Sequence, residues 1–124
     1  VPDGGWTVET HQRGGSFEWK RELVSLFLTE EQQSGSYIQG HDLRKVLEGT
    51  NPFNANLLDY LLAHPDLIPN DWKGKWVFFW GTIYRSSDGY LYVRCLHRSG
   101  GGGLWDYGWL DYDFDDDSPS AVPA

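Results

Sequence analysis

The strongest constraint on the fold is a pair of apolar runs, KWVFFWGTIYR at 75–85 and YLYVRCLHR at 90–98. The first run has apolar side chains at both odd and even positions, which is typical of a central strand covered on both sides. Asp88 and Gly89 lie between the two runs and favour a tight turn. The sequence therefore predicts an antiparallel β-hairpin.

Two helices are predicted before this hairpin. The first runs from about His41 to Glu48, and Gly49 is placed to end it in the left-handed conformation. The second can be capped by Asn54, and Pro65 marks its end. Its apolar stripe has the spacing of a buried helix face and consists of Leu57, Leu58, Leu61 and Leu62.

The remaining segments carry weaker signals. Residues 23–28 favour a strand, and the segment 30–40 is interpreted as a polar connection. Residues 1–15 have two Gly pairs and little apolar periodicity, which indicates a loose N-terminal arm. Beyond Arg98 we expect a loop, a short strand or two, and an acidic tail. Together these elements predict an α+β fold with two helices packed on an antiparallel sheet.

Length and charge narrow the possible functions. A chain of 124 residues is the size of one domain, so we expect a single domain over residues 1–124. Its net charge of −8 would repel nucleic-acid phosphates and anionic lipid, which makes a nucleic-acid partner unexpected. Because Cys95 is the only cysteine, the disulfide-stapled secreted classes are excluded.

The sequence leaves the localisation open. It has no run of about 18 apolar residues, so direct membrane insertion is not expected. Residues 1–15 lack the charged start and apolar stretch of a signal peptide. Since the chain does not begin with Met, a leader removed by processing stays compatible with the sequence, as do a cell-surface and a secreted location. We expect a monomer.

The aromatic content favours a binding function. Phe, Trp and Tyr make up 16% of the chain, which is more than the core of a domain this small needs. Some of these rings should therefore lie at the surface, where clustered apolar side chains usually mark an interaction site.

The C-terminal third has an unusual composition. From Arg85 to Ala124 there is no Glu, Lys, Gln or Met, and every acidic residue is Asp. Loops and strand ends favour Asp and Gly over helix formers, which is one sufficient explanation. A second is codon-based: randomising both adenines of an AAC or AAT codon never yields Glu, Lys, Gln, Met or Trp. Trp105 and Trp109 would then be fixed exceptions.

Two C-terminal stretches carry a family resemblance. FFWGTIYRSSDGYLYVRCL and WDYGWLDYDFDDDSPSAV resemble the C-terminal region of variable proteins from diversity-generating retroelements of uncultivated archaea and small-genome bacteria. The resemblance covers about the last half of the chain. It implies a C-type-lectin-like fold and a hypervariable ligand-binding region at 95–118. The chain departs from the family at Arg98, Gly103 and Phe114, where we expect Trp.

The resemblance also assigns residues. The ligand-binding, diversified positions would be Cys95, His97, Ser99, Leu104, Asp106, Gly108, Tyr112, Asp115, Asp117 and Ser118. The supporting framework would include Trp105, Tyr107, Trp109, Leu110, Asp111, Asp113, Asp116 and Pro119. The implied ligand is a protein or glycan on another cell or particle.

The physical argument for such a surface is alternation. In the segment 105–109, successive side chains of a strand point to opposite faces. We therefore expect the aromatic residues Trp105, Tyr107 and Trp109 to anchor inward, while Asp106 and Gly108 vary outward. Tyr, Ser, Gly and Asp are also the residues that paratopes favour, so the composition supports recognition rather than catalysis.

Three alternatives stay open. The first is an ordinary lectin domain, in which Trp and Tyr stack on sugars and the Asp residues of 111–117 hold Ca²⁺, although the EF-hand pattern is absent and we expect no metal or cofactor. The second is a small acidic interaction module, such as an inhibitor. The third is an enzyme that uses Cys95 as nucleophile and His97 as base, for which the spacing shows no orienting group.

Overall fold

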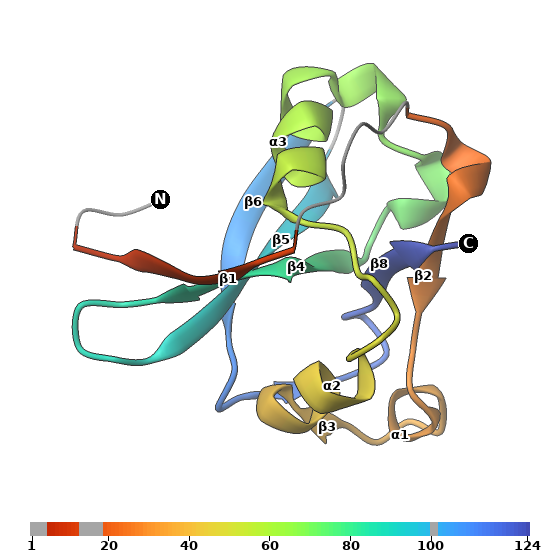
Figure 1. Ribbon diagram of the computed structural model, residues 1–124. Coiled ribbons are helices and arrows are strands. Elements are labelled where there is room, and N and C mark those ends of the chain that lie inside the picture. Colours follow the sequence, from red (N-terminus) through yellow and green to blue (C-terminus); the bar gives the residue numbers. More distant parts are fainter. Residues whose placement is uncertain (1–4, 13–18, 100–101) are drawn as a thin grey trace.

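The computed structural model describes residues 5–12, 19–99 and 102–124, and its main feature is a twisted sheet (Figure 1). The main path of the sheet runs β2, β8, β4, β5, β6, and β1 pairs with the second half of β4. Every pairing is antiparallel except the short contact between β4 and β8. The strands are β1 (Thr7–His11), β2 (Val24–Phe27), β4 (Trp76–Arg85), β5 (Leu91–Ser99), β6 (Gly102–Trp109) and β8 (Ser120–Pro123). A separate two-stranded ladder joins β3 (Ile38–Gln39) to β7 (Asp113–Phe114).

The predicted hairpin is confirmed. β4 and β5 pair from Trp76↔His97 to Arg85↔Leu91, with a register shift between Phe78 and Ile83. Gly89 has φ +92° in the connecting turn, a backbone conformation that favours glycine. The burial of β4 follows the prediction as well, because all its residues from Val77 to Tyr84 are buried.

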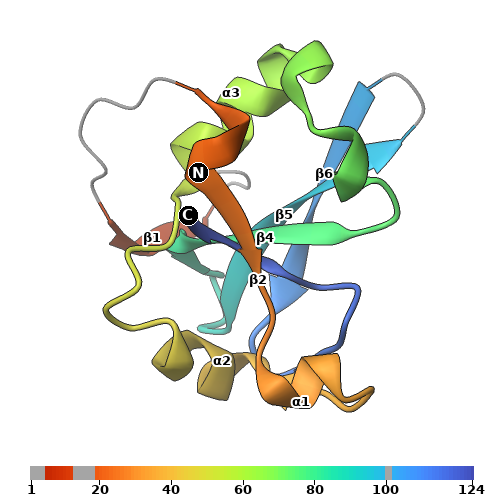
Figure 2. The same ribbon diagram turned by 90° about the vertical axis from the view of Figure 1, so that its right-hand side faces the viewer.

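Consecutive residues of β4 pack into two separate hydrophobic cores on opposite faces of the sheet. Phe79 packs with the leucines of α3 (Ala55–Ala63), while its neighbour Phe78 packs with Leu43 of α2 (Gly40–Val46). Figure 2 shows the corresponding layers, with α3 above the sheet and α2 below it. This arrangement explains why the run is apolar at both odd and even positions.

Both predicted helices are present. The side chain of Asn54 accepts a hydrogen bond from the Asn56 backbone N–H at the start of α3, and Gly49 has φ +85° after α2. Short 3-10 turns lie at Arg21–Leu23, Pro65–Leu67 and Asn70–Trp72.

A third helix was not predicted. The segment 30–40 was interpreted as a polar connection, but Glu30–Gln33 forms α1, with Thr29 and Gln32 in a capping box. Gln32 is fully buried, and its amide donates to the backbone oxygens of Asp115 and Ser118. A helix of four residues has no apolar period to detect, but the spacing of Thr29 and Gln32 is the sequence signature of a capping box and could have indicated the helix start.

Two further predictions are wrong. Thr7–His11 was expected to be part of a loose arm but forms β1, and Ser120–Pro123 was expected in the tail but forms β8 between β2 and β4. All five residues of β1 are exposed, so the strand has no alternating apolar pattern. The described part of the chain is therefore mixed α+β, as predicted, while the C-type-lectin-like architecture stays a prediction. None of the helices in the described ranges is long and apolar enough to cross a membrane.

Candidate functional site: an aromatic face on β5 and β6

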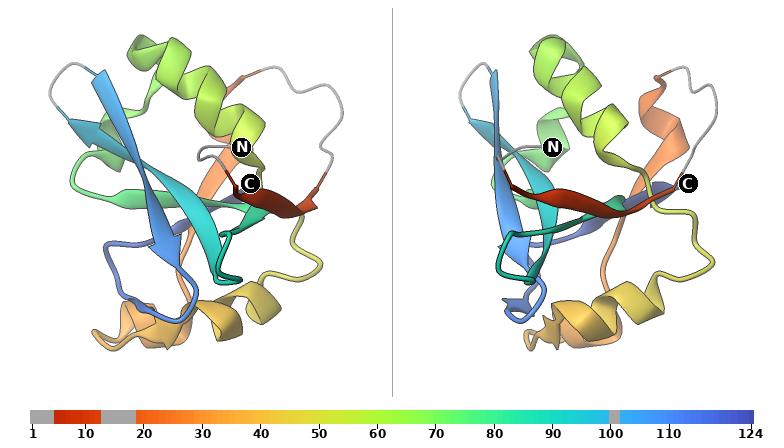
Figure 3. Two further views of the ribbon diagram at one scale, coloured as in Figure 1. Left: turned by 90° about the vertical axis from the view of Figure 1, so that its left-hand side faces the viewer. Right: turned by 60° about the vertical axis from the view of Figure 1, so that its left-hand side comes forward.

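Alternate residues of β5 and β6 form one aromatic surface. Tyr92 is opposite Trp109, and Arg94 is opposite Tyr107. Opposed residues of an antiparallel pair share a face of the sheet, so these side chains lie together. The rings of this surface, hereafter the aromatic face, belong to Trp6, Tyr90, Tyr92, Trp105, Tyr107, Trp109 and Tyr112. β6 is the end strand of the sheet, and it lies in front in the left view of Figure 3.

The α3 helix covers only part of this side of the sheet. Leu96, on the same side as Tyr92, packs with Leu57, Leu58 and Leu61 of α3. Further along the strands Trp6 takes the place of the helix, with its ring 4.7 Å from that of Tyr92 and 4.6 Å from that of Tyr107. Among the residues that the structure describes, the aromatic face is therefore the continuation of this side of the sheet beyond the end of the helix.

The rings contact one another and still reach solvent. Trp105 and Tyr107 meet edge to face at 5.1 Å, and so do Tyr90 and Trp109 at 5.0 Å. Tyr112 is 62% exposed, Tyr90 45% and Trp105 41%. Mutual packing restricts the rotamers of these side chains, so little conformational entropy is left to lose when a ligand covers them.

Arg94 anchors the end of the aromatic face nearest α3. Its guanidinium carbon lies 4.5 Å from the centre of the Trp105 ring, and its Nη2 lies 3.0 Å from a carboxylate oxygen of Asp59. Burial alone would lower the pKa of Arg94, but hydrogen bonds to Tyr84 and Asp59 outweigh it and raise the pKa. The guanidinium therefore stays charged although the residue is only 7% exposed.

A small pocket opens beside Arg94. Its volume is about 360 Å³, and its lining includes Arg94, Trp105, Asn56 and His11. The Nε of Arg94 is buried and has no hydrogen-bond partner among the described residues. The pocket thus joins the aromatic face to polar side chains of α3 and β1.

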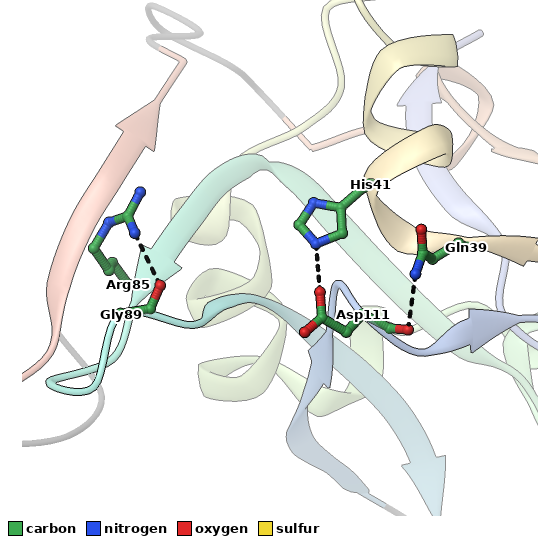
Figure 4. Close-up of polar contacts among 5 residues, drawn as sticks. All are labelled: Gln39, His41, Arg85, Gly89 and Asp111. Atoms are coloured by element: carbon green, nitrogen blue, oxygen red, sulfur yellow. Dashed lines mark hydrogen bonds and ion pairs between the residues drawn. The ribbon is translucent and has the colours of Figure 1, made fainter.

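The turns that flank the aromatic face are held by polar contacts (Figure 4). Asp111 follows β6, and its carboxylate lies 2.6 Å from Nε2 of His41. Its carbonyl oxygen accepts a hydrogen bond of 3.2 Å from the amide of Gln39. In the β4–β5 turn, Arg85 donates to the carbonyl oxygen of Gly89 at 2.9 Å. These contacts fix the backbone next to Tyr112 and Tyr90.

The predicted alternation of β6 is wrong at Gly108 and Trp105, while Asp106 is exposed as predicted. Gly108 was expected to point outward, but an added Cβ would lie 2.5 Å from the ring of Phe78, inside the core on the α2 side. Trp105 was expected inward and is exposed instead. The cause is that Phe78 and Phe114 already fill the space under Gly108, which leaves the rings of β6 on the other face.

Cys95 also lies in that core rather than outward. It is 1% exposed, and burial, the main cause, raises the pKa of its thiol to about 12. A thiol with this pKa is protonated at neutral pH and is a poor nucleophile. His97 is half-buried and stacks on Trp76 at 4.2 Å, with Nδ1 3.2 Å from the carbonyl oxygen of Lys75.

The structure does not gather the other predicted variable positions into one patch. Leu104 and Asp106 are exposed on the face of the hairpin opposite the aromatic face. Tyr112 belongs to the aromatic face, through its contact with Trp109. The side chain of Ser99 lies outside the described residues. Asp115, Asp117 and the half-buried Ser118 lie on the loop before β8.

The carboxylate of Asp115 stabilises the loop at 115–118. Asp115 accepts hydrogen bonds from the Asp117 backbone N–H and the Ser118 hydroxyl. The carboxylates of Asp115, Asp116 and Asp117 come within 4.8 Å of one another and are exposed. The predicted framework residues Asp111 and Asp113 are also exposed.

Sequence reasoning missed part of the aromatic face. Trp6, Tyr90, Tyr92 and Arg94 were not among the predicted site residues, although YLYVR alternates large side chains at 90, 92 and 94. This alternation, opposite a second one at 105, 107 and 109, could have indicated a shared surface.

Comparison with known proteins identifies no relative: no family model, no curated protein and no solved structure matches the chain.

Proposed function

We propose that this protein is a non-enzymatic binding module that recognises its ligand with the aromatic face. The observation that carries the proposal is the continuous group of partly exposed rings on β5 and β6, on one side of the sheet beyond the end of α3. A sheet of this size is stable without exposing Trp and Tyr, so rings left in solvent are more useful for recognition than for folding. Covering roughly 150 Å² of ring surface gives about 4 kcal/mol of apolar transfer free energy, from which the entropic cost of association has to be subtracted.

The site has the properties of a preorganised recognition surface. The rings are held by one another, and the turns on both sides are pinned by Asp111 and Arg85. Rigid aromatics provide contact area at low entropic cost. The enzyme alternative is less well supported because its proposed nucleophile, Cys95, is buried with a raised pKa.

The test uses two unbiased probes, a phage-displayed random peptide library and a glycan array. The wild type should select ligands that the Trp105→Ala/Tyr112→Ala variant does not retain, because this variant removes two of the exposed rings. Tyr37→Ala is the matched control, since Tyr37 is 59% exposed and precedes β3. Ligands retained equally by the double variant, or no ring-dependent ligand in either library, would contradict the proposal.

A second candidate adds hypervariability to this binding function. Several positions that the retroelement resemblance marks as diversified have exposed side chains: Leu104, Asp106, Tyr112, Asp115 and Asp117. Changes there would not disturb either core. Cys95 and Gly108 would instead have to stay constant or nearly so, because they face the core on the α2 side.

Sequencing of the genomic locus tests this candidate. It requires a reverse-transcriptase gene and a near-copy of the codons for 95–118 that differs only at template adenines. The copy should differ at 104, 106 and 112 and agree at 108. A locus without such a copy removes the retroelement interpretation and leaves the binding function standing.

A further inference from the structure

The aromatic face carries information about the kind of ligand, beyond the fact of binding. Taking the proposed function as given, we infer that its ligand is a basic peptide segment whose Lys or Arg side chains lie against the rings. Three observations support this choice: the orientation of the rings, the charges near them, and an arginine of this chain whose guanidinium already lies over one ring.

The most exposed rings do not form a flat platform. Trp105 crosses Tyr107 at 89°, Tyr90 crosses Trp109 at 84° and Tyr112 crosses Trp109 at 61°, whereas the half-buried Tyr92 is closer to parallel with Trp109, at 18°, and with Trp6, at 28°. An extended sugar chain stacks best on exposed rings that are coplanar, but Trp105, Tyr90 and Tyr112 each stand across a neighbouring ring. A cation needs only the negative face of one ring at a time, so separate side chains of a peptide suit this arrangement better.

Two carboxylates lie on the turns beside the rings, Asp88 between β4 and β5 and Asp111 after β6. Burial raises the pKa of Tyr92 most strongly, and the negative charges of Asp88 and, less strongly, of Asp111 raise it further. The nearest buried cation, Arg94, is already neutralised by Asp59. With a net charge of −8 on the whole chain, the potential at this surface favours a cationic ligand and disfavours an anionic one.

Arg94 shows the contact that such a ligand would repeat. Its guanidinium lies over the ring of Trp105 at 4.5 Å while its own charge is held by a carboxylate, Asp59. Tyr112 and Tyr90 offer further exposed rings, and Asp111 and Asp88 are the carboxylates nearest to them in the chain, although Asp111 also contacts His41 and Asp88 accepts a hydrogen bond from Ser86. The group of Arg94, Trp105 and Asp59 is therefore the pattern for the contact that we infer.

The experiment uses the full chain and three probes of similar length: acetylated hexa-arginine amide, acetylated hexaglutamate amide and cellohexaose. Binding is followed by NMR through the indole N–H signals of Trp105 and Trp109, which are identified with Trp→Phe variants. Hexa-arginine should shift these two signals in a saturable way, and its affinity should fall several-fold when salt rises from about 50 to 300 mM. The other two probes should leave the signals in place.

Charge variants separate a specific site from general attraction to an acidic protein. Asp88→Asn/Asp111→Asn keeps the shape of both side chains, and an amide oxygen can still accept the hydrogen bonds from Ser86 and His41. It should weaken hexa-arginine binding about three- to tenfold while the melting temperature stays unchanged. Glu30→Gln/Glu31→Gln is the control, because it removes the same charge from exposed residues of α1. Equal weakening by both variants, or no shift of the indole signals by hexa-arginine, overturns the inference.

The outcomes also distinguish this inference from the proposed function. If cellohexaose or hexaglutamate shifts the signals of Trp105 and Trp109 more strongly than hexa-arginine does, the ligand class is wrong while the aromatic face remains the binding site. If hexa-arginine binds but Trp105→Ala/Tyr112→Ala leaves its affinity unchanged, the peptide binds elsewhere and the inference fails, while the proposed function is still decided by the library screens.

Discussion

Gly108 provides the sharpest test of how β6 is oriented. A methyl group added by Gly108→Ala would lie 2.5 Å from Cε2 of Phe78 and 3.0 Å from Cζ of Phe114. Both rings are buried, with 6% and 3% of their surface exposed, so neither can swing into solvent. Overpacking of this kind costs about 1–3 kcal/mol, which should lower the melting temperature by roughly 3–15 °C in a domain of this size.

The matched control is Gly102→Ala, which makes the same chemical change on the same strand. An added Cβ at Gly102 meets no atom of the described residues within 4 Å, its chain neighbours aside, so this variant should be neutral or more stable by up to about 1 kcal/mol. Urea unfolding followed by Trp fluorescence measures both variants. If Gly108→Ala is within about 0.5 kcal/mol of the wild type, position 108 points outward, and the orientation of β6 described above is refuted.

The remaining predictions concern buried polar groups. Asp59→Ala should destabilise the fold by about 1–3 kcal/mol in urea unfolding, because it leaves the buried guanidinium of Arg94 without its carboxylate partner; a loss below about 0.3 kcal/mol would contradict the buried pair. Cys95 should resist iodoacetamide at pH 8 in the folded protein and react after unfolding, since its folded pKa is about 12; fast labelling of the native state would count against its burial. Because the folded pKa of Tyr92 is raised, its contribution to stability is present below pH 10 and is lost as the pH rises through the folded pKa, so Tyr92→Phe should flatten the alkaline fall in melting temperature; an unchanged slope would contradict this. Gln32→Leu should cost about 1–3 kcal/mol, because the backbone oxygens of Asp115 and Ser118 lose their donor in two part-buried hydrogen bonds; an unchanged urea midpoint would contradict the role of these hydrogen bonds.

The elements that could be predicted from the sequence are those whose residue pattern reflects the burial of their side chains or marks where they begin. The hairpin was evident because β4 is apolar on both faces, and α3 because its leucines and Asn54 mark its buried side and its start. β1 has only exposed side chains and is held by backbone pairing with β4. β8 is too short, at four residues, to show a period, and its central place depends on strands far away in the sequence.

The orientation of β6 shows that an alternating pattern alone does not decide which face of a strand is buried. The segment 105–109 alternates aromatic with small or polar residues, and the pattern fits both rings inside and rings outside. The usual preference for burying aromatics favours the first, but it ignores what occupies the other face. There Phe78 and Phe114 come so close that only a residue without a side chain fits at 108. In a strand that alternates rings with glycine, the glycine can mark the closely packed side, and the rings are then left on the open side, where a ligand can reach them.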